Sequence, residues 1–165
     1  MFQGWVAPIK RLRENYYFSM ALAWIAKPIQ RSGRKLATQL QSSVRKNGGR
    51  VRLPNGQTMR IARDSGIWMA SLLFWNGVDG YERETSNTLR FFFSRVRTFI
   101  DVGANYGLYS LLGALWNPEL AVVAFEPLPS IYAGLKRNIF LNKLELRVTC
   151  VNAALADRSG QAIIH

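Results

Sequence analysis

The feature that most constrains the fold is an alternation of apolar strands and helical segments that begins at residue 98. The pattern predicts strands at 98–102, 121–125 and 146–151, with helices at 108–116 and 130–141 between them. Strands that alternate with helices are typical of a parallel sheet, and continuous apolar strands indicate a sheet that is covered on both faces. We therefore predict an α/β fold with about three parallel strands.

The composition excludes several other classes of protein. The chain has 165 residues, of which 48% are hydrophobic, so it can bury roughly two-thirds of its unfolded surface and is not a disordered chain. The single cysteine, Cys150, excludes a disulfide framework and a multi-cysteine zinc site, and we predict no metal site. Because Cys150 lies in an apolar run, we expect an inert core thiol. No apolar run approaches the ~20 residues that a membrane-spanning helix needs.

The net charge of +12 is concentrated in the N-terminal third of the chain. Residues 1–60 contain twelve Lys or Arg and one acid, a net charge of +11, whereas residues 101–165 contain five of each and are neutral. A domain that binds nucleic acid through its core is not expected to divide its charge in this way, so we expect no nucleic-acid partner.

Residues 9–46 have the pattern of two basic helices. One interpretation is peripheral contact of residues 1–46 with an anionic membrane, with Tyr16, Tyr17 and Trp24 at the interface. The other is that these helices pack on the domain that follows and keep their charges in water. The three aromatic residues and the lack of a clear cleavage site argue against a signal peptide, so we expect a cytoplasmic protein with membrane association left open.

Between this arm and the α/β region, the sequence predicts a short connecting unit. Residues 50–63 alternate in polarity around Pro54-Asn55-Gly56, as a β-hairpin does. Residues 67–75 are apolar and fit either a helix or a strand, and residues 82–94 predict a helix with Leu89, Phe92 and Phe93 on its inner side. We accordingly divide the chain into a basic helical arm (1–49), a hairpin and helix (50–97) and an α/β half-domain (98–165).

The residues that indicate chemistry lie where the first α/β strand meets its helix, in Asp-Val-Gly-Ala-Asn-Tyr-Gly at 101–107. Gly103 and Gly107 allow a sharp turn and the close approach of a ligand, and the helix that follows has a positive dipole end. Nineteen residues after Gly107, Glu126 ends the second strand, where a carboxylate can accept hydrogen bonds from both hydroxyls of a ribose.

Two nucleoside cofactors fit this arrangement to different degrees. A dinucleotide site favours Gly-x-Gly-x-x-Gly, but here the spacing is Gly-x-x-x-Gly and Asn105 stands where the middle glycine would fall. The carboxylate of Asp101 would repel a pyrophosphate and attract the ammonium group of S-adenosylmethionine. The residues therefore favour S-adenosylmethionine over NAD. Asn105 has a second interpretation, in which it adopts left-handed geometry for the turn and contacts nothing.

The stretches FIDVGANYGLYSLLGA, VVAFEPLPSIYAGLKRNIFLN and VNAALADRSG resemble the FkbM-type class I methyltransferases, over roughly residues 77–165. The resemblance implies a Rossmann-like class I methyltransferase sheet, here preceded by basic helices and a β-hairpin, that binds S-adenosyl-L-methionine. It also implies a role for each matching residue. Asp101, Gly103, Ala104 and Asn105 would line the methionine moiety of the cofactor, and Gly107 would let the helix start close to it. Glu126 would bind the ribose, and the adenine would lie near Asn152, Ala153 and Ala154.

The resemblance also implies strands that these 165 residues do not supply. The family fold has about seven strands, whereas the chain offers three and at most the start of another at 161–164. A later acidic segment of the family is absent, so we expect a fragment of a longer enzyme. Without it no general base can be named, and the catalytic residues stay unknown. We expect Tyr106 and Tyr109 to serve packing.

Two functions remain open at this stage. The first is O-methylation of a hydroxyl on a glycan or natural product, with a small-molecule or glycan acceptor as the partner. The second is a non-catalytic, truncated binding protein whose basic arm associates with a membrane or another polyanion. Under the first, we expect Glu126→Ala to weaken cofactor binding far more than it disturbs the fold, because a strand-end carboxylate in a cleft is not part of the core.

Overall fold

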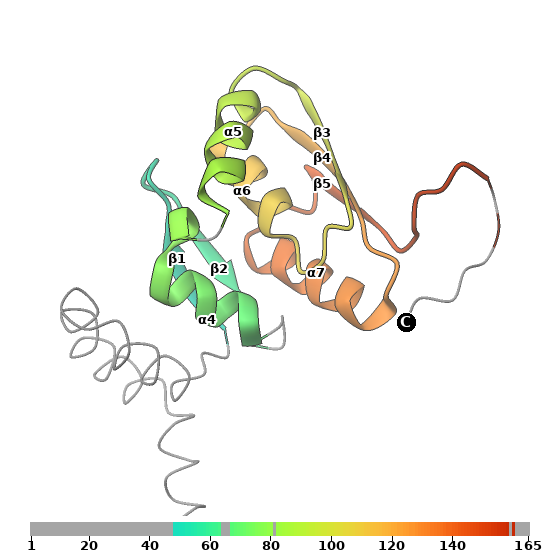
Figure 1. The fold of residues 1–165 in the computed structure, drawn as a ribbon, viewed down its shortest axis with the longest axis horizontal. Coiled ribbons are helices and arrows are strands. Elements are labelled where there is room, and N and C mark those ends of the chain that lie inside the picture. The colour runs from blue at the N-terminus through green and yellow to red at the C-terminus, as the bar shows by residue number, and fades with distance from the viewer. Residues whose placement is uncertain (1–47, 64–66, 81, 159, 161–165) are drawn as a thin grey trace, which may run out of the picture.

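The computed structural model describes residues 48–63, 67–80, 82–158 and 160. The two helices predicted within residues 9–46 and the strand start predicted at 161–164 lie outside these residues. The described part contains a two-stranded antiparallel sheet and a three-stranded parallel sheet (Figure 1). The α/β class predicted from the sequence is confirmed.

The hairpin is formed by β1 (Gly49–Arg52) and β2 (Thr58–Ile61), as the alternating polarity predicts. The turn between them closes with a hydrogen bond of 2.8 Å from the backbone N–H of Leu53 to the carbonyl oxygen of Gln57. Their inner face is apolar, with Met59 and Ile61 buried.

Residues on the C-terminal side of the hairpin form α4 (Ile67–Asn76), a 3-10 turn η1 (Val78–Gly80) and α5 (Arg83–Phe93). The segment that fitted either a helix or a strand is therefore a helix. The prediction that Phe93 lies on the inner side of α5 is confirmed, because this residue is buried. The same prediction is wrong for Phe92, which is 51% exposed. Leu89 packs against the core from the same helix, whereas Phe92 lies at the edge of the apolar face and contacts the neighbouring ring of Phe91 instead. No helix in the described part of the chain has the length and apolar character needed to cross a bilayer.

The parallel sheet has the order β3-β4-β5 and the helical connections that the sequence predicts. In chain order its elements are β3 (Thr98–Val102), α6 (Leu108–Trp116), β4 (Ala121–Phe125), α7 (Pro129–Leu141) and β5 (Val148–Val151). The last strand begins two residues later than predicted, because Leu146 lies fully exposed in a turn. The positions of β3, β4 and both helices differ from prediction by at most one residue.

The described helices cover one face of this sheet, which corrects the expectation of cover on both faces. Phe99 and Asp101 point toward the helices: Phe99 packs edge-on against Phe93 of α5, with 5.1 Å between the ring centroids, and Asp101 contacts α6. On the opposite face, Ile100 and Val102 are 57% and 59% exposed. Figure 1 shows α5 and α6 together on one side of the strands. The described residues therefore bury the apolar residues on one face of β3 and leave those on the other face exposed.

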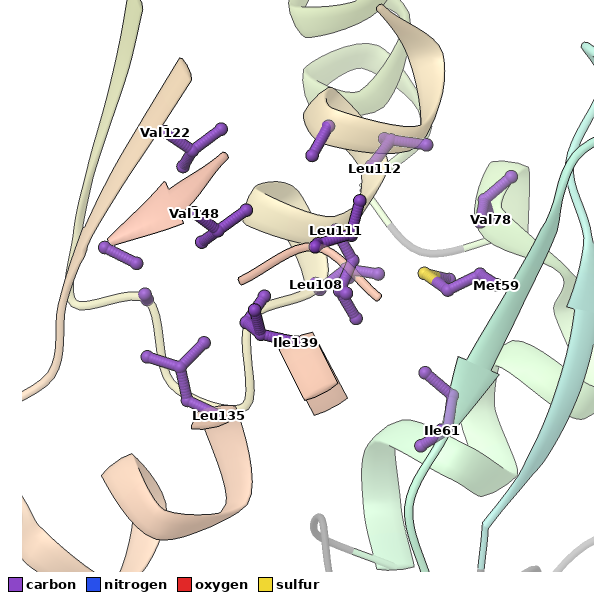
Figure 2. Close-up of a cluster of buried hydrophobic side chains, with 14 of the residues drawn as sticks. Met59, Ile61, Val78, Leu108, Leu111, Leu112, Val122, Leu135, Ile139 and Val148 are labelled. Carbon is purple, nitrogen blue, oxygen red and sulfur yellow. The ribbon is translucent and has the colours of Figure 1, made fainter. Parts of the chain in front are cut away.

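A single apolar core joins the hairpin to the parallel sheet. Figure 2 shows Leu111 and Leu112 of α6 between the sheet residue Val122 and the hairpin residue Met59. Because α6 packs on both sheets, the hairpin is held on the α/β unit. The boundary predicted at residue 97 is not tested by this packing and stays a prediction.

Candidate functional site

The candidate site lies at the carboxyl ends of β3 and β4, where the loop of residues 103–107 leads into α6. The backbone N–H groups of Gly103 and Ala104 both donate to the carbonyl oxygen of Phe125, at 3.0 and 2.8 Å. Gly103 has a φ of +73°, which lets the chain turn back toward β4 at this point. The loop is therefore fastened to the end of the neighbouring strand.

Glu126 holds the same loop from the side of β4. Its Oε2 accepts a hydrogen bond of 2.9 Å from the N–H of Asn105, and its Oε1 accepts one of 2.9 Å from the N–H of Leu128. The residue is 5% exposed. The expectation of a strand-end carboxylate outside the core is therefore wrong, because the side chain is buried and bonded to two backbone groups.

Asn105 adopts the left-handed conformation, with a φ of +52°. This conformation turns its N–H toward Glu126, so the interpretation in which Asn105 contacts nothing is excluded. Its side-chain oxygen accepts a hydrogen bond of 2.8 Å from the N–H of Tyr106. Asparagine tolerates this conformation better than most residues because its short polar side chain can bond locally.

Asp101 of β3 bonds to the first turn of α6, the helix that follows the loop. The Oγ of Ser110 donates to its Oδ2 at 2.5 Å, and the backbone N–H of Ser110 also bonds to the carboxylate. Asp101 is 8% exposed, and burial raises the pKa of its carboxyl above the ordinary value, with the two bonds from Ser110 partly opposing the rise. A carboxylate that is costly to ionise in its present surroundings would gain from a cationic ligand.

The two glycines of the loop serve different purposes. Gly107 has a φ of +85°, and a Cβ built there would lie 2.5 Å from the Cδ1 of Leu135, so α6 starts in close contact with α7. A Cβ built on Gly103 would meet nothing within 4 Å, and this residue is exposed. Gly103 therefore leaves open space beside the loop, whereas Gly107 permits close packing.

Asn152 and Ala153 follow β5 at the same edge of the sheet. The side-chain amide of Asn152 donates to the backbone carbonyl oxygens of Glu126 and Pro127, at 2.8 and 3.0 Å, and Ala153 is half-buried. The structure thus brings Asn152 to the backbone of Glu126. The roles that the sequence gives to these residues, and to the others of the site, stay predictions.

The site offers a ligand more hydrogen-bond acceptors than hydrogen-bond donors. All five loop N–H groups from residue 103 to residue 107 already have acceptors within the loop or at the end of β4. Two buried carboxylates stand at the ends of neighbouring strands, Asp101 within β3 and Glu126 directly after β4. A pyrophosphate needs unoccupied N–H groups, whereas ribose hydroxyls and an ammonium group need acceptors. The residues present therefore fit S-adenosylmethionine better than a dinucleotide.

Sequence reasoning missed several contributors to the site. Ser110 and the N–H of Leu128 hold the two carboxylates, and Tyr109 donates from its hydroxyl to the Glu82 side chain at 2.5 Å. Ser110 lies in the first turn of α6, where a hydroxyl directed at a strand-end acid is a signal that the sequence contains. Among the described residues, no group of three or more His, Cys, Asp or Glu side chains could hold a metal ion.

No protein-family model matches the chain. It is similar to methyltransferase sdnD of Sordaria araneosa, with 38% identity over 61 residues, which is 37% of this chain and 24% of that protein. It is also similar to the 31-O-demethyl-FK506 methyltransferase FkbM of Streptomyces tacrolimicus, with 38% identity over 60 residues, or 36% of this chain and 22% of that protein. Over this stretch the chain is a distant relative of FkbM-type methyltransferases. The resemblance predicted from the sequence is confirmed, and the chain spans about a quarter of the length of these curated relatives.

Two solved structures that match part of the chain are described as methyltransferases. The S-adenosylmethionine-dependent methyltransferase SibL in its apo form has 24% identity and a TM-score of 0.43, over 56% of this chain and 28% of SibL. An O-methyltransferase family protein from Burkholderia thailandensis has 21% identity and a TM-score of 0.39, over 48% of this chain and 24% of that chain.

Proposed function

We propose that the protein takes part in S-adenosylmethionine-dependent methyl transfer to a hydroxyl oxygen, as an FkbM-type methyltransferase. The observation that supports this most strongly is the acceptor-rich site, in which the loop amides are all used and two buried carboxylates remain to receive donors. When bound, S-adenosylmethionine supplies an electrophilic methyl group. The contribution of the chain is to fix the position of the cofactor, which lowers the entropic part of the barrier.

In this proposal each carboxylate binds a different part of the ligand. Asp101 lies beneath the exposed Gly103 and carries the charge that an ammonium group needs, so it binds the methionine moiety. Glu126 is oriented by two backbone N–H groups, and each of its oxygens has a second lone pair for a ribose hydroxyl. Asn152 and Ala153 lie beside the strand that ends at Glu126 and border the adenine.

For the acceptor, we extend the proposal to a hydroxyl on a glycan or natural product. The support is the name of one relative, a 31-O-demethyl-FK506 methyltransferase. Both relatives are matched over about a quarter of their length, so the acceptor, the general base and the partner of the whole protein belong to the proposal.

The test is calorimetric titration of the chain with S-adenosylmethionine, with 5′-methylthioadenosine, and with NAD. The second ligand keeps the adenosine and lacks the amino acid, so it separates the two carboxylates. Asp101→Asn should weaken S-adenosylmethionine by roughly tenfold or more, the value of one charge-assisted bond, and leave 5′-methylthioadenosine nearly unchanged. Binding of NAD with no response to S-adenosylmethionine would overturn the proposal.

A further inference from the structure

The outer face of the hairpin carries three arginines on two short strands. Arg50 and Arg52 of β1 and Arg60 of β2 are exposed and alternate with the inward-facing residues of their strands. In the antiparallel register Arg50 stands directly opposite Arg60, and Arg52 stands opposite Thr58. The three arginines therefore share one face of the hairpin, and it is the face turned away from the core.

Arg50 and Arg60 form a non-hydrogen-bonded cross-strand pair, the type in which opposite side chains are closest. The backbone N–H of Arg60 donates to the side chain of Asn142 at 2.8 Å, and its carbonyl oxygen accepts from the same amide at 2.7 Å. Both backbone groups of Arg60 therefore point away from β1, so the two arginines form a non-hydrogen-bonded pair. In such pairs the Cα atoms are about 4.5 Å apart and the side chains stand closest.

Like charges in this position destabilise a hairpin, because opposed side chains interact directly. In the part of the chain that the structure describes, the one ion pair joins Arg90 to Asp79, and none involves the arginines of the hairpin. Nothing described within the fold therefore offsets the repulsion between Arg50 and Arg60. Among the described residues this pair is therefore a cost to the fold, and its two guanidinium groups are exposed to an anionic partner.

The arginine face is also held rigidly. Besides the two bonds between Arg60 and Asn142, the side-chain oxygen of Asn138 accepts from the N–H of Ala62 at 2.8 Å. At the other end, the side-chain amide of Asn55 in the turn donates to the carbonyl oxygen of Leu115, at 3.1 Å. The hairpin is thus fixed to α6 and α7 at both ends. Arginines on a fixed backbone lose less entropy on binding than the same residues on a flexible segment.

We propose that Arg50, Arg52 and Arg60 form a docking surface for an anionic phospholipid membrane. Guanidinium groups bind phosphate in a planar, bidentate manner, and a row of them matches a plane of headgroups. The described face holds no aromatic residue on which a nucleic-acid base could stack, and stacking supports most binding of single-stranded nucleic acid. Residues 1–46 add basic and aromatic residues on the N-terminal side of the hairpin, but they lie outside the described residues, and their membrane contact stays a prediction.

The experiment uses sedimentation to measure binding of the full chain to two kinds of vesicle. One is pure phosphatidylcholine, and in the other about 30% of the lipid is phosphatidylserine. The variant is Arg50→Gln/Arg60→Gln, and the control is Arg97→Gln/Arg158→Gln, which removes the same charge from exposed arginines outside the hairpin. The hairpin variant should lose about 25-fold in partition onto anionic vesicles, roughly fivefold for each charge, and the control should lose less than about threefold.

Thermal unfolding separates this result from misfolding. Because the variant removes a like-charge pair, its melting temperature should be equal to or higher than that of the wild type. Equal losses of binding in both double variants would overturn the proposal, since net charge alone would then account for them. Unchanged vesicle binding of the hairpin variant would also overturn the proposal. So would a wild-type chain that binds no vesicles and binds a short single-stranded RNA more strongly than soluble inositol phosphates.

Discussion

Replacement of Glu126 by alanine is the perturbation that bears most directly on the proposed site. The carboxylate accepts from the N–H of Asn105 and from the N–H of Leu128, each at 2.9 Å, and it is 5% exposed. Bonds to a charged group are worth about 1.5–3 kcal/mol each. We expect a loss of about 2–4 kcal/mol in the free energy of unfolding, below the sum of the two bonds because water can enter the space left by the carboxylate.

The same substitution should weaken S-adenosylmethionine binding by at least about tenfold, because two ribose hydroxyls lose a charged acceptor. Alanine alone cannot distinguish a ligand contact from a loosened loop, so a matched variant is needed. Leu128→Pro removes the N–H that bonds to Oε1 and leaves the carboxylate in place. Leu128 has a φ of −79° and an extended ψ, which proline can adopt, and its side chain is 36% exposed.

The assay pairs urea denaturation with calorimetric titration for the wild type and both variants. Leu128→Pro should lose stability by about 1–3 kcal/mol and keep its affinity within about threefold, because its Glu126 oxygens remain available to the ribose. Glu126→Ala should lose both. If the affinities of the two variants fall in proportion to their stabilities, Glu126 acts only as a fastening for the loop. Retained affinity in a folded Glu126→Ala variant would refute the ribose contact outright.

Two further predictions concern the loop. Burial raises the pKa of the Asp101 carboxyl, so its ionisation destabilises the fold as pH rises through that pKa. The gain in free energy of unfolding from Asp101→Asn should therefore be largest near about pH 7–8 and shrink toward about pH 4. Urea denaturation across this pH range is the measurement, and a pH-independent difference between variant and wild type would contradict the prediction. Gly107→Ala combines a left-handed φ with a contact of 2.5 Å to Leu135, whereas Gly56→Ala has the same φ of +85° and open space. Thermal unfolding should therefore show a loss at least about 1 kcal/mol larger at Gly107, and equal losses would refute the packing role.

The local pattern of the sequence was sufficient to predict the elements of the α/β unit. The bounds of α6 and β4 agree with prediction because strong local signals mark their ends: Gly107 begins the helix, and Glu126 with Pro127 ends the strand. The sheet order β3-β4-β5, which was not predicted from the sequence, places strands that are consecutive in the chain side by side.

The contacts that hold the site together could not be predicted in the same way. Asn152 bonds to the backbone carbonyls of Glu126 and Pro127 across 26 and 25 residues, and an asparagine after a strand has no periodicity that would indicate such partners. Likewise, the apolar residues of β3 predict two buried faces, but a one-dimensional pattern does not say which segment covers each. The burial of Glu126 was missed because its partners are backbone N–H groups, which every sequence contains.

Asn105 connects the local sequence to the chemistry of the site. It stands where a dinucleotide loop would place its middle glycine, and with a φ of +52° it adopts the conformation that such a glycine would supply. Its N–H is directed at Glu126, so it does not face a phosphate. A loop whose amides are bonded within the loop and to the end of β4 cannot cradle an anion, whereas Glu126, which receives the amide of Asn105, keeps lone pairs for donors. In the proposed function, this departure from the dinucleotide pattern is what favours a ligand with hydroxyl and ammonium groups over a pyrophosphate.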